Sequence, residues 1–297
     1  MLHKLRMLLD SIKIAHSVFA LPFALIALLA AARGRPSWRV LGLTILCMVA
    51  ARSAAMSFNR WADRDFDAAN PRTRDWPNVS GKIRPRLMLG FTALSAVVLL
   101  AGAWALNWTC FLLSPCALAV LLGYSYAKRF TSLTHFWLGL ALGLAPVAAH
   151  LAERGDLWPL AWLAGRWGLP IESFPLILCG AVLLWTAGFD LIYACQDVEH
   201  DRRDPRLHSL PKSIGVARSL RLSALLHLGS VALLVAAGAY AGLGGWFWAA
   251  LAGVAALLVY EHWIVRPDDL SRVNTAFFTV NGAVSLLLLA AVVVDGM

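Results

Sequence analysis

The sequence predicts an all-α membrane protein with nine transmembrane helices. Of its 297 residues, 60% are hydrophobic and only 14% are charged, and its mean hydropathy is +0.68. Soluble domains contain about 25% charged residues, which excludes most soluble enzymes and any disordered or fibrous chain. Apolar stretches of about 20 residues, enough to cross a bilayer, recur along the chain. The 13 Trp residues agree with this class, because indole rings favour the membrane interface.

Each apolar stretch is expected to be a helix, because an isolated strand cannot satisfy its backbone in lipid. The predicted spans are 15–32, 38–62, 87–106, 108–126, 133–152, 174–197, 218–240, 244–265 and 273–294. The first span follows basic residues and superficially resembles a signal peptide. It is long enough to cross the membrane and further spans follow, so we expect an uncleaved helix in a single domain, 1–297.

The loop charges predict a cytoplasmic N-terminus. With that orientation, 19 of the 26 Lys and Arg residues fall in cytoplasmic segments and five on the other side. This bias is typical of multi-pass proteins, and nine spans then place the C-terminus outside. The same bias explains the net charge of +9, so we expect a lipid bilayer and no nucleic acid as partner. A bacterial-type inner (plasma) membrane is the expected location.

Two acidic stretches, each at the cytoplasmic end of a predicted helix, form an internal repeat. With an offset of 134 residues, Asp63, Asp67, Pro71 and Arg72 recur as Asp197, Asp201, Pro205 and Arg206. Position 65 also stays acidic, as Glu199. Four identities at one offset predict an ancient duplication that relates about 59–72 to 193–206.

The spacing within each copy predicts a shared direction. Residues four apart lie on one helical face, with Cβ atoms roughly 5–6 Å apart. Asn59 and Tyr193 extend the two acidic stripes by one turn, while Arg52 and Asp190 lie seven residues before Asn59 and Asp197. Carboxylates this close repel one another unless cations compensate. Mg²⁺ suits such a site, since it binds one or two carboxylates together with waters and phosphate oxygens. Facing Asp pairs with basic neighbours therefore predict a Mg²⁺–diphosphate site.

Other polar residues have simpler interpretations. Asp65, Glu199 and Asp204 are expected to be solvated. Arg52 and Asp190 lie deeper, where a charge is costly and indicates function, although pairing with each other is the alternative. Asn274 and Asn281 fit a site role and interhelical hydrogen bonding equally well.

The pattern Asn59-x-x-x-Asp63-x-x-x-Asp67 together with Tyr193-x-x-x-Asp197-x-x-x-Asp201 resembles the UbiA superfamily of intramembrane prenyltransferases. The segments Lys13–Pro22, Tyr124–Thr131 and Asn274–Asn281 are similar to further family elements, so the resemblance covers essentially the whole chain. The loop after the first motif departs from the family, because 74–81 has a longer Pro-to-Gly spacing than many relatives.

This resemblance implies a nine-helix bundle with a central cavity and a polar cap on the cytoplasmic face. It implies transfer of a polyprenyl group from polyprenyl diphosphate to an acceptor, usually aromatic, with Mg²⁺. The residues expected to hold Mg²⁺ are Asn59, Asp63, Asp67, Asp197 and Asp201, and those expected to contact phosphate are Arg72, Lys128 and Arg206. Phe58, Trp61, Phe189 and Tyr193 are candidates to stabilise an allylic cation.

The residues expected at the acceptor are Asp190 and Arg52. Asp190 is expected to orient a hydroxyl group or accept a proton, and Arg52 to bind the acceptor's carboxylate or a phosphate. The N-terminal pattern resembles the 4-hydroxybenzoate polyprenyltransferase group most, which implies a role in ubiquinone or menaquinone biosynthesis. The alternative acceptors are 1,4-dihydroxy-6-naphthoate, of the futalosine route to menaquinone, and another molecule such as haem. A transporter is the alternative of a different class, but the acidic stripes end at a basic loop and not at midplane.

Overall fold

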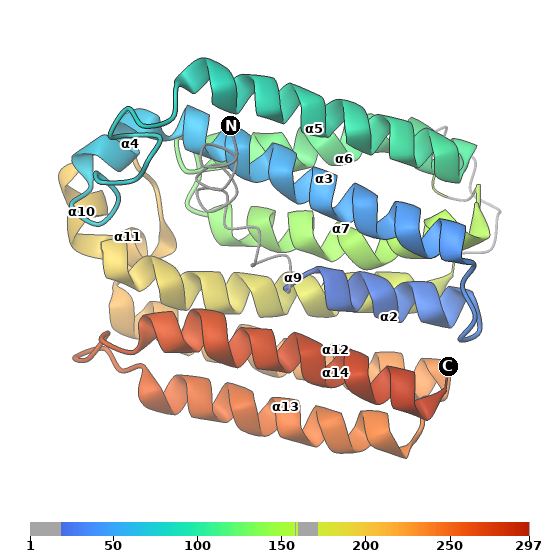
Figure 1. Cartoon of the computed structure of the whole chain (residues 1–297). Helices are drawn as coiled ribbons and strands as arrows, with labels where there is room; N and C mark the ends of the chain where they lie inside the picture. Colours follow the sequence, from blue (N-terminus) through green and yellow to red (C-terminus); the bar gives the residue numbers. More distant parts are fainter. Residues whose placement is uncertain (1–18, 158, 160–171, 297) are drawn as a thin grey trace.

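The chain is a bundle of long helices whose axes run side by side (Figure 1). The computed structural model describes residues 19–157, 159 and 172–296, and within these ranges there is no β-strand beyond an isolated bridge between Arg266 and Asp269. In the same ranges eight helices are long and apolar enough to cross a membrane. This confirms the all-α membrane class. Of the first predicted span, 15–32, the described part forms α2 (Leu21–Ala31), so the count of nine and the N-terminal orientation stay predictions.

The observed helices agree closely with the predicted spans. The long helices are α3 (Trp38–Ala62), α5 (Pro85–Leu106), α6 (Trp108–Ala127), α7 (Thr134–Arg154), α9 (Ser173–Ala194), α12 (Val216–Ala241) and α13 (Gly245–Ile264). The chain ends with a π-helical segment, η3 (Thr275–Val280), that leads into α14 (Asn281–Asp295). Three short helices, α4 (Arg64–Ala69), α10 (Val198–Arg203) and α11 (Leu210–Ile214), lie together at one end of the bundle (Figure 1).

Polar caps define where several helices begin. The Ser37 hydroxyl accepts a hydrogen bond from the Val40 amide at the start of α3. Asn107 alone separates α5 from α6, and its side chain accepts from the Cys110 amide. The same side chain donates to the Leu151 carbonyl near the end of α7 at 2.8 Å. One residue therefore ties the ends of three helices together.

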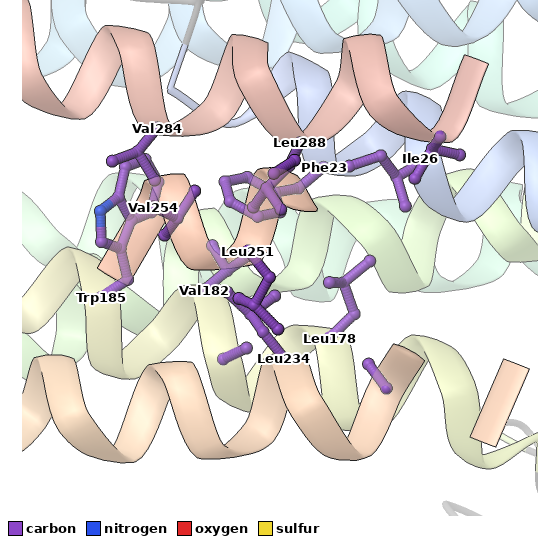
Figure 2. Close-up of a cluster of buried hydrophobic side chains, with 14 of the residues drawn as sticks. Phe23, Ile26, Leu178, Val182, Trp185, Leu234, Leu251, Val254, Val284 and Leu288 are labelled. Atoms are coloured by element: carbon purple, nitrogen blue, oxygen red, sulfur yellow. The ribbon is translucent and has the colours of Figure 1, made fainter. Parts of the chain in front are cut away.

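Helix α9 lies at the centre of the bundle, packed between α7 and α12. Its Trp185 and Phe189 are 2% and 1% exposed and belong to a core shared with α2, α12, α13 and α14. Figure 2 shows Trp185, Val182 and Leu178 among the side chains of those helices. The α7–α9 contact depends on small residues, because a Cβ at Gly143 would lie only 2.8 Å from the Cys179 carbonyl oxygen.

The outward faces of the outer helices are apolar. Leu94 and Val97 of α5, Leu225 and Leu228 of α12, and Val259 of α13 are between 59% and 71% exposed. Apolar side chains on both the inner and outer faces of a helix are typical of a membrane bundle, where lipid replaces water as the surrounding solvent. The outer surface therefore supports a multi-pass membrane protein.

The π-helical segment changes the face of the last helix on which the residues after it lie. In a regular α-helix Asn274 and Asn281, seven residues apart, would share a face. Here Asn274 is exposed, whereas Asn281 is completely buried. The side-chain oxygen of Asn281 accepts a hydrogen bond from Trp185 Nε1 at 2.6 Å, and its side-chain Nδ2 donates to Glu261 Oε1 at 2.8 Å. Of its two predicted roles, Asn281 therefore has the interhelical one.

Candidate active site

The two predicted motifs have matching local structure. The helical path breaks at Asp63, with φ −93° and ψ 3°, and at Asp197, with φ −96° and ψ 1°. Each break is followed by a six-residue helix, α4 and α10. The Asp63 amide still donates to the Asn59 carbonyl, and the Asp67 amide to the Asp63 carbonyl, at 2.9 and 2.8 Å. The four-residue stripes therefore persist although each helix is interrupted, which the sequence did not predict.

A cavity of about 460 Å³ opens beside these breaks, among α3, α6, α7, α9 and η3. All residues expected to bind metal, phosphate or acceptor line it except Arg206, and so does Tyr193; these are Arg52, Asn59, Asp63, Asp67, Arg72, Lys128, Asp190, Tyr193, Asp197 and Asp201. Asn274 lines it as well. Residues separated by more than 100 positions in the sequence thus meet around one space.

In the first motif, the buried Asp63 is held by polar neighbours. Lys128 Nζ lies 2.9 Å from Asp63 Oδ2, and the side-chain Nδ2 of Asn59 donates to the same oxygen at 2.8 Å. Arg60 Nη1 lies 3.8 Å from Asp67 Oδ2. Burial raises the pKa of Asp67, and the guanidinium of Arg60 partly offsets this effect. Basic groups therefore compensate both carboxylates at close range.

In the second motif, Asp197 accepts hydrogen bonds from the loop that follows the first motif. Arg72 donates to both Asp197 oxygens, at 3.0 and 2.6 Å, and Asn70 donates to one of them at 3.0 Å. Arg72 also donates to the Tyr193 hydroxyl at 3.0 Å. Asp201 accepts from the Ser209 hydroxyl at 2.8 Å. The bidentate contact is a strong, directional one that links the two copies of the repeat.

Arg206 differs from its repeat partner Arg72. It folds back onto Asp204, with Nη2 2.6 Å from Oδ2, and lies over the Phe66 ring. Hydrogen bonds from Arg206 lower the pKa of Asp204 to about 2. Arg206 lines a neighbouring surface hollow rather than the main cavity. The equivalence that the repeat predicted for Arg72 and Arg206 therefore does not extend to their contacts.

The far wall of the cavity contains a contact that was not predicted. His135, at the start of α7, places Nδ1 2.7 Å from Asp190 Oδ2. The alternative prediction, that Arg52 and Asp190 pair with each other, is therefore corrected, because Asp190 has a nearer partner on α7. Arg52 Nε is buried and has no hydrogen-bond partner among the described residues. The sequence feature that could have indicated His135 as a site residue is the polar pair Thr134–His135 at the edge of an apolar stretch.

The aromatic candidates divide into two groups. Phe189 and Tyr193 line the cavity, and Phe277 of η3, which the sequence analysis did not single out, lies with them at ring-centroid distances of 5.1 and 4.3 Å. Phe58 and Trp61 pack on each other at 5.5 Å and do not line the cavity, so their predicted contact with a cation is not supported. They lie on the opposite face of α3.

The first motif offers oxygen ligands of the kind that a magnesium ion prefers. Asp63 Oδ1 and Asp67 Oδ2 are buried and accept no hydrogen bond from the described part of the chain. No three His, Cys, Asp or Glu side chains within that part converge closely enough to hold a metal by themselves. This arrangement fits Mg²⁺, which binds through one or two carboxylates and completes its shell with waters and phosphate oxygens.

Comparison with known proteins identifies the family. A profile of the UbiA prenyltransferase family matches residues 20–283. The chain belongs to the UbiA prenyltransferase family. A curated relative, 4-hydroxybenzoate octaprenyltransferase of Pseudomonas fluorescens (strain SBW25), is 33% identical over 269 residues, which cover 91% of this chain and 85% of the relative. Membership confirms the predicted prenyltransferase-type enzyme and decides against a transporter.

Solved structures of UbiA homologs have the same fold. The apo structure of a homolog from Aeropyrum pernix K1 matches with a TM-score of 0.83 and 32% identity, over 96% of this chain and 99% of that one. A homolog from Archaeoglobus fulgidus bound to DMAPP and Mg²⁺ matches with a TM-score of 0.69 and 20% identity, over 97% and 98%. The second likeness shows the fold alone. Together they confirm the predicted UbiA-like bundle.

Proposed function

We propose that this chain transfers a polyprenyl group from polyprenyl diphosphate to a hydroxylated aromatic acid of the 4-hydroxybenzoate type, in quinone biosynthesis. The observation that carries this proposal is the meeting of two aspartate motifs with Arg72 and Lys128 around one cavity. The far wall of that cavity bears Arg52, a cation suited to a carboxylate. The 4-hydroxybenzoate octaprenyltransferase relatives favour this acceptor.

In this proposal Asn59, Asp63, Asp67, Asp197 and Asp201 hold Mg²⁺. When bound there, the ion neutralises charge on the diphosphate oxygens and stabilises the leaving group. The oxygen-rich donor set supports this role, as do the two carboxylate oxygens of the first motif that accept no hydrogen bond from the described residues. Lys128 and Arg72, which contact Asp63 and Asp197, would then divide their hydrogen bonds between these carboxylates and the diphosphate oxygens.

The basic side chains assist departure of the diphosphate. Lys128 and Arg72 now contact Asp63 and Asp197, so both lie beside the proposed diphosphate position. Their charge-assisted hydrogen bonds grow stronger as negative charge accumulates on the departing oxygens, which favours breaking the allylic C–O bond. Tyr193 and Phe277 face the same space with aromatic rings that can stabilise an allylic cation. Arg206 pairs with Asp204 and lines the neighbouring surface hollow, so it lies farther from the proposed diphosphate position.

The acceptor occupies the deeper part of the cavity in this proposal. Arg52 binds its carboxylate and Asp190 lies near its hydroxyl group, so that the ring carbon beside the hydroxyl faces the cation. Orientation of this kind favours attack on the cation over its capture by water. The polar end of the bundle, with α4, α10 and α11, faces the cytoplasm of a bacterial-type inner membrane, as the predicted loop charges require (Figure 1).

A membrane assay tests this function. Membranes containing the protein receive geranyl diphosphate and radiolabelled 4-hydroxybenzoate, with Mg²⁺ or with EDTA, and 1,4-dihydroxy-6-naphthoate is used in parallel. We expect a lipid-soluble product from 4-hydroxybenzoate that requires Mg²⁺. Product from the naphthoate alone would transfer the assignment to the other quinone route, and pyrophosphate release without either product would point to another acceptor such as haem. No pyrophosphate release from folded protein would refute the proposal.

A further inference from the structure

His135 is a buried histidine in the wall of the cavity. Its side chain is only 4% exposed, and its Nδ1 lies 2.7 Å from Asp190 Oδ2. The other ring nitrogen, Nε2, is buried and has no hydrogen-bond partner within the described ranges. A buried ring nitrogen without a partner is costly in an apolar interior, so its presence beside a cavity needs an explanation.

The contact with Asp190 determines the state of the ring. A carboxylate beside Nδ1 favours the tautomer that carries its proton on Nδ1, which leaves the lone pair of Nε2 available. Asp190 itself is engaged by this contact and is less free to act as the proton acceptor directly.

We propose that His135 is the general base of the reaction and that Asp190 is its positioning residue. This inference rests on the proposed function, because it requires a phenolic acceptor in the cavity. Arg52, Tyr124 and Asp190, which come from α3, α6 and α9, line the same cavity as His135. Arg60 of α3 and Tyr193 of α9 also line this cavity, whereas the described part of α2, which packs on α7 as well, contains no charged or titratable residue.

The allylic C–O bond breaks and the diphosphate leaves with the electron pair. The ring carbon beside the acceptor's hydroxyl forms the new C–C bond, while His135 Nε2 takes the proton of that hydroxyl. The resulting dienone then loses the ring proton to water and becomes aromatic again. Loss of that proton leaves a phenolate oxygen, and the imidazolium returns its proton there, so the product regains its hydroxyl group. One proton is released overall and the enzyme is unchanged after one turnover.

The test compares wild-type protein with His135→Gln over a range of pH. A phenol ionises in water with a pKa of about 10, so alkaline buffer increasingly supplies the phenolate without a base. We expect His135→Gln to lower kcat about 100-fold or more at pH 6.5, and we expect the loss relative to wild type to shrink at least tenfold at pH 9. The KM for geranyl diphosphate is expected to stay within about twofold. Asp190→Asn is expected to show a smaller loss of the same pH-dependent kind.

A matched control is present on the same helix. His150 of α7 is also buried beside a carboxylate, with Nε2 3.2 Å from Asp156 Oδ2, but it does not line the cavity. His150→Gln is expected to leave kcat unchanged. If His135→Gln does not fold, His135→Ala takes its place in the same comparison.

The outcomes separate this inference from the proposed function. A loss of equal size at both pH values, or a loss below threefold, would overturn the role of His135 while wild-type turnover still supported the function. Wild-type protein that prenylates no phenolic acid would overturn both.

Discussion

Replacing Asn281 with leucine tests the buried contact between α14, α9 and α13. The Asn281 side chain accepts from Trp185 Nε1 and donates to Glu261 Oε1, and all three residues are at most 2% exposed. Leucine has a similar size but no polar atom. The substitution therefore leaves the indole N–H and one carboxylate oxygen without a hydrogen-bond partner inside the bundle.

The expected destabilisation follows from the number of interhelical hydrogen bonds. Two such bonds are lost, and interhelical hydrogen bonds in membrane proteins contribute on average about 0.6 and at most about 1.7 kcal/mol each. We therefore expect the free energy of unfolding to fall by about 1–3 kcal/mol. Prenyl transfer at low temperature is expected to continue, because Asn281 does not line the cavity.

Unfolding by SDS in mixed micelles, followed by tryptophan fluorescence, measures this change. Thr279→Ala is the matched control, since Thr279 lies two residues away and is exposed, and we expect it to change stability by less than about 0.5 kcal/mol. A fully stable Asn281→Leu protein that has lost turnover would refute the reasoning. It would assign Asn281 to the site and not to interhelical packing.

Three further predictions concern the site and the packing around it. Asp63→Ala and Asp197→Ala are each expected to abolish product formation without preventing membrane insertion. The control is Glu199→Gln, at an exposed residue, which is expected to retain turnover. Normal product formation by either Ala variant would exclude the metal site. Arg52→Lys is expected to raise the KM for the acceptor more than that for the prenyl diphosphate, and the reverse would assign Arg52 to phosphate. Gly188→Ala is expected to lower stability by about 1–3 kcal/mol, because the added methyl would meet the His227 ring; an unchanged SDS midpoint would contradict this.

The sequence predicted the long helices well, because their length and apolar character depend only on neighbouring residues. The span 38–62 coincides with α3, and the other described spans differ from the predictions only at their ends. The spacing of the acidic residues also led to the right parts of the chain, since every residue expected to bind metal, phosphate or acceptor except Arg206 lines one cavity. Both features depend on the order and spacing of residues along the chain, which can be read from the sequence alone.

Contacts between helices were harder to predict. His135 and Asp190 meet because α7 packs on α9. Residue spacing along the chain does not determine which helices are neighbours, so this contact could not be predicted. The repeat also suggested equal roles for Arg72 and Arg206, yet Arg72 reaches across to Asp197 while Arg206 pairs with the local Asp204. Identical positions in a repeat thus acquire different partners once each copy has its own surroundings.

The π-helical segment Thr275–Val280 offsets the residues before it from those after it around the axis of the last helix. Each residue of an α-helix advances the chain by about 100° around the axis. A π-helical turn holds about one residue more than an α-helical turn, so the residues of α14 lie about that angle away from the faces that they would occupy in an uninterrupted α-helix. Without this turn Asn274 and Asn281 would share a face, and the helix could serve either the cavity or the core. One extra residue in this turn lets a single helix contribute to both.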